Sequence, residues 1–138
     1  ENNPHISYFD EESFNLKYAK KTDSGWEIET VDKKGGERTN ISLDKKGNPV
    51  ISYISNGEIE TRFLDEARVE KYLKENKDFC ISSNSFKVAR KNNHSWQIRT
   101  IDLGEIGDNS LLIDNEGNVH LLWQDLFSDK LKYLKTSF

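Results

Sequence analysis

Residues 4–24 read PHISYFDEESFNLKYAKKTDS, and the same pattern returns at residues 119–138 as VHLLWQDLFSDKLKYLKTSF. The two stretches align without a gap and share identical residues at His5/His120, Asp10/Asp125, Ser13/Ser128, Leu16/Leu131, Lys17/Lys132, Tyr18/Tyr133 and Lys20/Lys135. Such a repeat indicates a chain built from similar units, each of which packs on its neighbours.

Two further repeats lie between these stretches. WEIETVD at 26–32 matches WQIRTID at 96–102, and LDKKGN at 43–48 matches IDNEGN at 113–118. The segments are short, rich in β-branched and aromatic residues, and separated by turn residues, which is typical of antiparallel strands. Gly47 and Gly117 stand where a tight hairpin needs a positive φ, so we expect both glycines to be structural.

Four short strands in a unit of about 40 to 45 residues are typical of a β-propeller blade. With Ile6 as the reference, its counterparts are Ile51, Ile81 and Leu121, at intervals of 45, 30 and 40 residues. The sequence therefore predicts an all-β fold, an antiparallel meander of about three to four β-propeller blades in an incomplete ring. The predicted repeat units are residues 1–39, 40–66, 67–107 and 108–138.

The interval of 30 residues indicates that the second unit has lost an outer strand. Residues 71–83 align with residues 41–53, so the next pair of strands would begin early and place Cys80 where Val50 lies. The alternative is a short charged helix near residues 65–77, with Asp65 as its N-terminal cap. The polar connector at 33–38 (KKGGER) is predicted to be a solvated turn.

The composition excludes several classes of function. The chain has 138 residues, a net charge of −4, a single cysteine and 11% aromatic residues. A net negative charge disfavours nucleic acid as a partner, because phosphates attract a basic face. One cysteine forms no internal disulfide and no multi-cysteine zinc site, and no apolar run is long enough to span a membrane. We therefore expect no nucleic-acid partner, no membrane insertion, no metal and no cofactor.

At these residues the chain resembles a group of bacterial and archaeal β-propeller repeats with GNPHISY, LKYA and W-IETVD motifs. The resemblance is carried by residues 44–53 (DKKGNPVISY), 4–8 (PHISY), 16–19 (LKYA) and 26–32, and it is weak at 54–78. It implies a propeller in a larger, exported or surface-attached protein, without implying a particular reaction. The first and last units each lack a strand at the end of the sequence, which would leave unpaired sheet edges, so we expect other blades of a parent chain, or further copies of this chain, to complete the ring.

Two pairs of equivalent residues are candidates for ligand binding. His5 and His120 could converge on a ligand in a symmetric ring, and Asp10 and Asp125 could line a pocket. The structural alternative is a buried, hydrogen-bonded histidine and an aspartate that caps a turn.

Recurring aromatic residues predict packing between blades. Trp26, Trp96, Tyr18 and Tyr133 recur at fixed positions in the repeat, so we expect them to be structural. Trp123 is predicted to pack in the same way, or, if exposed, to stack on the apolar face of a sugar.

Repetition without a catalytic irregularity favours a non-catalytic module that binds a protein or a glycan, and we assign no catalytic residue. The alternative, implied by the architecture shared with sialidase-like propellers, is part of a glycoside-processing or lyase enzyme. The sialidase Asp-box is not matched at residues 42–47, where the turn is one residue longer. A third alternative is a structural spacer in a surface protein.

Overall fold

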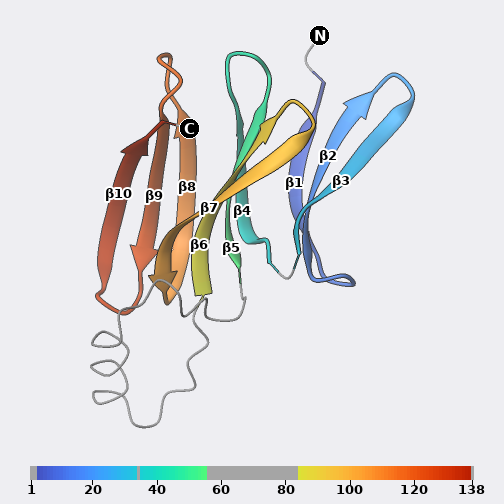
Figure 1. Ribbon diagram of the computed structural model, residues 1–138. Coiled ribbons are helices and arrows are strands. Elements are labelled where there is room, and N and C mark those ends of the chain that lie inside the picture. The colour runs from blue at the N-terminus through green and yellow to red at the C-terminus, as the bar shows by residue number, and fades with distance from the viewer. Residues whose placement is uncertain (1–2, 34, 56–83, 138) are drawn as a thin grey trace.

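A computed structural model of the chain describes residues 3–33, 35–55 and 84–137. These residues form ten strands and no helix (Figure 1). The strands are β1 (His5–Asp10), β2 (Asn15–Thr22), β3 (Gly25–Lys33), β4 (Glu37–Leu43), β5 (Pro49–Ser55), β6 (Asn84–Asn92), β7 (Ser95–Gly104), β8 (Ile106–Ile113), β9 (Val119–Asp125) and β10 (Lys130–Thr136). A search of the described residues for a helix long and apolar enough to cross a membrane found none.

The strands form three antiparallel sheets that lie side by side. The first sheet has the order β1-β2-β3, the central sheet β4-β5-β6-β7, and the third sheet β10-β9-β8. In Figure 1 the central sheet stands between the first sheet on the right and the third sheet on the left, and β4 contacts both β1 and β8. The predicted all-β antiparallel meander is therefore confirmed, and within the described residues the sheets do not close into a ring.

The central sheet contains strands from two of the predicted units. β5 pairs with β6, from Val50↔Arg90 to Ser55↔Ser85, and β6 pairs on its other edge with β7. β4 and β5, which lie in the predicted unit 40–66, and β6 and β7, which lie in the predicted unit 67–107, thus form one sheet. The strand or helix expected at 65–77, and Cys80, lie outside the described residues.

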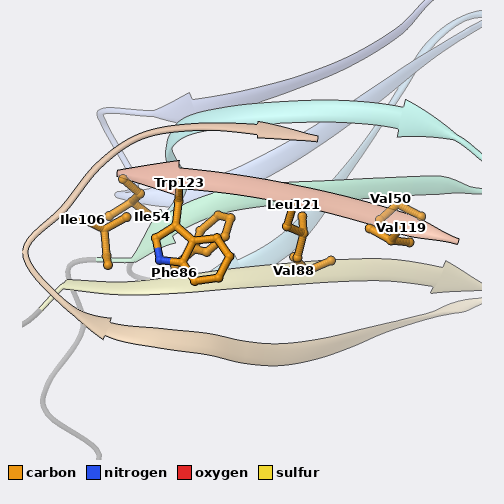
Figure 2. Close-up of a cluster of buried hydrophobic side chains, with 8 residues drawn as sticks. All are labelled: Val50, Ile54, Phe86, Val88, Ile106, Val119, Leu121 and Trp123. Atoms are coloured by element: carbon orange, nitrogen blue, oxygen red, sulfur yellow. The ribbon is translucent and has the colours of Figure 1, made fainter. Parts of the chain in front are cut away.

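Two hydrophobic clusters hold the sheets together, one on each side of the central sheet. The first junction, between the first and central sheets, contains Leu16, Tyr18, Val31, Ile51, Tyr53 and Ala89. The second junction, between the central and third sheets, contains Val50, Ile54, Phe86, Val88, Ile106, Val119, Leu121 and Trp123 (Figure 2). Since successive residues of a strand point to opposite faces, the alternation of β5 supplies Ile51 and Tyr53 to one junction and Val50 and Ile54 to the other.

Equivalent hairpins connect β4 to β5 and β8 to β9. Asp44 Oδ1 accepts hydrogen bonds from the backbone N–H groups of Lys46 and Asn48 at 2.8 and 2.9 Å, and Asp114 repeats this arrangement with Glu116 and Asn118. Gly47 and Gly117 have φ values of 78° and 87°, in the region that costs glycine least. The repeated D-x-x-G-N sequence thus encodes a repeated turn.

The connector between β3 and β4 is not a solvated turn, because both of its glycines are buried. Gly35 N–H donates to the carbonyl of Phe14, and Gly36 N–H donates to the carbonyl of Ile54. A Cβ atom on Gly36 would lie 2.8 Å from the Cα of Leu16. Glycine is required here because two sheets approach each other closely at the connector.

Candidate functional site

The histidine candidates lie on different sheets, and each has a structural partner. His5 Nδ1 lies 2.6 Å from the Tyr18 hydroxyl, and His120 Nδ1 lies 2.8 Å from the Tyr133 hydroxyl. Partial burial, and then the charge of Lys20, lower the pKa of His5. Because the central sheet stands between β1 and β9 (Figure 1), the two histidines do not converge on one ligand.

Asp10 and Asp125 cap the turns that follow β1 and β9. Asp10 accepts a 2.5 Å hydrogen bond from the Ser13 hydroxyl, which is the main cause of its lowered pKa. Asp125 accepts a 2.8 Å hydrogen bond from the Ser128 hydroxyl and a 2.9 Å contact from Lys132 Nζ. Partial burial raises the pKa of Asp125, but the hydrogen bonds from Lys132 and Ser128 outweigh it and lower the pKa to about 2. Both aspartates thus act as turn caps.

Trp123 is a buried junction residue and not an exposed ring on which a sugar could stack. Its side chain is 6% exposed, and its ring centroid lies 5.2 Å from that of Phe86 (Figure 2). Its Nε1–H donates a 2.8 Å hydrogen bond to Asp102 Oδ2, which also accepts one from Lys132 Nζ at 2.7 Å. The indole therefore joins the third sheet to the central sheet.

The first junction contains the same arrangement, which we call the aspartate latch: an aspartate near the end of the outer strand of one sheet binds an aromatic residue and a lysine of the next sheet. Asp32 Oδ2 accepts a 2.7 Å hydrogen bond from the Tyr53 hydroxyl and lies 3.5 Å from Lys87 Nζ. Burial, followed by the adjacent charge and hydrogen bond of Asp32, raises the pKa of Tyr53. The residues Asp32, Tyr53 and Lys87 correspond in register to Asp102, Trp123 and Lys132.

The described residues contain no cluster of three or more histidine, cysteine, aspartate or glutamate side chains that could hold a metal ion.

The outer face of the first sheet points away from the central sheet. It carries the same residues as the face of the central sheet that forms the first junction. It presents Ile6, Tyr8, Lys17, Ala19, Lys21, Trp26 and Ile28, and the central sheet presents Ile51, Tyr53, Lys87, Ala89, Lys91, Trp96 and Ile98 to the first junction. All seven pairs are identical, and their cross-strand pairing is also the same. The outer face of the first sheet thus has the composition of a surface that a neighbouring sheet covers.

The outer face of the third sheet, which also points away from the central sheet, repeats the other half of the first junction. Its His120, Leu131, Tyr133 and Lys135 are identical to His5, Leu16, Tyr18 and Lys20, which the first sheet presents to the central sheet. Leu16 is 0% exposed but Leu131 is 69% exposed, and Tyr18 is 3% exposed but Tyr133 is 59% exposed. Leu112 and Leu122 add two exposed leucines to this face.

A hollow of about 420 Å³ lies on the third sheet near the turn between β9 and β10. Its lining comes from three strands and the turn, and consists of Asp108, Asn109, Ser110, Leu122, Trp123, Gln124, Asp129, Lys130 and Leu131. The hollow opens next to the exposed leucines of the outer face, so a protein that binds this face would also cover it.

The four aromatic residues that we expect to be structural differ in burial: a neighbouring sheet packs on Tyr18 and Trp96, whereas none packs on Trp26 or Tyr133 in the described residues. Tyr18 and Trp96 meet edge to face, with ring centroids 5.3 Å apart, and Trp96 Nε1–H donates to Glu29 at 3.1 Å. Trp26 is instead 47% exposed, with Lys21 Nζ 5.6 Å from its ring centroid. Within the described residues Trp26 and Tyr133 each lie on a face without a neighbouring sheet, so the packing between blades that we expect for them stays a prediction.

Comparison with protein-family models gave no match, and comparison with curated proteins gave none.

The aspartate latch was not predicted from the sequence. The signal was present, since Asp32 and Asp102 end the two W-x-I-x-T-x-D segments. Their partners Tyr53 and Trp123 lie 21 residues further along in both cases, but the two side chains differ in type. Pairing them required the stacking of sheets, which sequence spacing does not reveal.

Proposed function

We propose that this chain is a non-catalytic module of the β-propeller repeat type, and that it functions by binding protein through the outer faces of its first and third sheets. The observation that carries the proposal is that the outer face of the first sheet has a complete set of junction residues, of which Ile6, Trp26 and Ile28 are exposed. Ile6 is 44% exposed on the first sheet, whereas its equivalent Ile51 is fully buried in the first junction. Exposed contiguous apolar surfaces on a folded protein mark interaction sites.

The chemistry of the faces favours a protein over a glycan. Each outer face has a single exposed ring, Trp26 or Tyr133, among exposed isoleucines or leucines. This composition matches the apolar surface of a sheet more closely than it matches a site for a sugar, which needs flat rings together with convergent hydrogen-bonding groups. Asp10 and Asp125 are committed to their turns by the hydrogen bonds from Ser13 and Ser128. This arrangement supports a binding role in preference to acid–base catalysis.

The proposal is tested by affinity capture from extracts of the source organism, followed by reconstitution with the purified partner. Ile6→Lys and Leu131→Lys place a charge on one face each, and Asn115→Lys is the control. Asn115 is exposed at a hairpin tip, and the equivalent residue of the other hairpin is Lys45. We expect at least one face variant to weaken binding about tenfold or more, because an unpaired lysine charge is costly to bury.

Two results would contradict the proposal. One is equal binding of the partner by the wild type and by both face variants. The other is hydrolysis of a fluorogenic glycoside by the chain that is lost on Asp125→Asn while the fold persists.

A further inference from the structure

We infer that the outer face of the third sheet binds the outer face of the first sheet of a second copy of this chain, head to tail. This inference rests on the proposed function, since it names the partner of both faces. A second copy is the occupant because the chain carries on its two ends both halves of an interface that it already forms internally.

The first junction is the template for the contact. There the first sheet contributes Leu16 and Tyr18, and the central sheet contributes Ile51, Ala89 and Trp96. Tyr18 contacts the Trp96 ring edge to face, and all these side chains except Trp96 are at most 5% exposed. The junction therefore buries a leucine and a tyrosine of one sheet against an isoleucine, an alanine and a tryptophan of the next.

The two outer faces reproduce these halves. Leu131 and Tyr133 stand for Leu16 and Tyr18, and the His120–Tyr133 hydrogen bond of 2.8 Å repeats the His5–Tyr18 bond of 2.6 Å. Tyr133 is thus held in the orientation in which Tyr18 meets Trp96. On the second copy, Ile6, Ala19 and Trp26 stand for the other half, so the contact places Tyr133 against Trp26.

Leu122 of the third sheet replaces a serine that the first and central sheets share, and this difference also fits the contact. In both internal junctions a serine binds a polar residue of the next sheet's first strand: Ser7 Oγ lies 2.8 Å from Thr39 Oγ1, and Ser52 Oγ lies 2.6 Å from Asn109 Oδ1. At the equivalent position the third sheet carries Leu122, which forms no such bond. Within the described residues the first sheet has no strand equivalent to β4, so on a second copy no side chain corresponds to Thr39 or Asn109 as the partner of a serine at that position.

The contact lacks the aspartate latch. Within the described residues the third sheet has no strand equivalent to β3 or β7, so no carboxylate corresponds to Asp32 or Asp102. Tyr8 and Lys17 of the second copy therefore gain no acidic partner from this sheet. We expect self-association in the micromolar range, weaker than the internal junctions. Because the two faces differ, the contact is heterologous and forms closed assemblies or longer chains according to its rotation.

The experiment is sedimentation velocity of the whole 138-residue chain across the micromolar range. The average mass is expected to rise with concentration from that of one copy, 16.0 kDa, to that of two or more. Ile6→Lys and Leu131→Lys should each weaken self-association about tenfold or more, because the contact would bury an unpaired charge. Asn115→Lys, which adds the same charge away from both faces, should associate like the wild type.

Mixing the two face variants tests the head-to-tail geometry. Ile6→Lys keeps an intact third sheet and Leu131→Lys keeps an intact first sheet, so an equimolar mixture should form a one-to-one complex that neither variant forms alone. A variant that self-associates like the wild type would show that its altered face is not used, and would overturn the inference.

A wild-type chain that stays monomeric throughout the concentration range also overturns the inference. That result leaves the proposed function standing, because the capture experiment tests binding of the same faces to another protein. The proposed function itself fails if the wild type, Ile6→Lys and Leu131→Lys all bind the captured partner with the same affinity.

Discussion

The outer face of the first sheet and the matching face of the central sheet carry the same residues in different surroundings. Trp26 and Trp96 pair with Lys21 and Lys91 in identical register, yet Trp96 contacts Tyr18 and Glu29 of a neighbouring sheet and Trp26 is 47% exposed. The two tryptophans differ in exposure because a neighbouring sheet packs on Trp96 and none packs on Trp26 within the described residues, and not because their own strands differ. A repeated aromatic residue is therefore buried only where the next sheet covers it.

The largest expected difference between the two faces is the loss of unfolding free energy when each tryptophan is replaced by alanine. Trp96→Ala should lower the free energy of unfolding by about 3 kcal/mol, because it removes a large ring from the first junction. Trp26→Ala should cost less than about 1 kcal/mol in dilute protein, as expected for a surface change. Urea denaturation of both variants measures the difference, and equal losses would show that the two faces are equally covered.

A smaller effect is expected from removing the hydroxyl of the aspartate latch. Tyr53→Phe should destabilise the fold by about 1–2 kcal/mol, because Asp32 loses a 2.7 Å hydrogen bond in a largely buried position. Tyr8→Phe at the equivalent position of the outer face is the control, and should change stability by less than about 0.5 kcal/mol. If Tyr53→Phe and Tyr8→Phe had the same denaturation midpoint, the stabilising role of the Tyr53–Asp32 hydrogen bond would be contradicted.

The smallest expected effect is a pH dependence of the free energy of unfolding, which comes from His5 on the inner face of the first sheet. The folded-state pKa of His5 is lowered by its partial burial and by Lys20, so the unfolded chain binds more protons as the pH falls below the ordinary value of 6.5. The stability that depends on neutral His5 is present above that value and decreases below it. His5→Gln should therefore flatten the change in urea midpoint between about pH 7.5 and pH 5.5. An unchanged slope would exclude His5 as its source.

Much of the fold could be predicted from the repeat. The spacing of the aromatic and β-branched residues predicted antiparallel strands, and the D-x-x-G-N hairpins at Asp44 and Asp114 were recognisable because a short turn depends on nearby residues. The sequence did not show that β5 and β6 pair across 28 intervening residues, 56–83. A long connection leaves no local signal of which strands its ends join.

The candidate site was less predictable than the fold. His5, Asp10, Trp123 and their equivalents were identified as recurring residues, but recurrence does not distinguish a ligand-binding group from a turn cap or a junction residue. Hydrogen bonds to Tyr18, Ser13 and Asp102 made that distinction. The outer faces were overlooked because their residues are the same as those of a covered sheet.

The strands, the hairpin turns and the repetition of one sheet pattern follow from the amino-acid sequence, since they depend on side-chain alternation and on the φ preferences of single residues. Which copy of each repeated residue is buried follows from the packing of the sheets. Burial depends on the sheet that stands opposite: Leu16 is covered by the central sheet, and within the described chain Leu131 has no sheet to cover it.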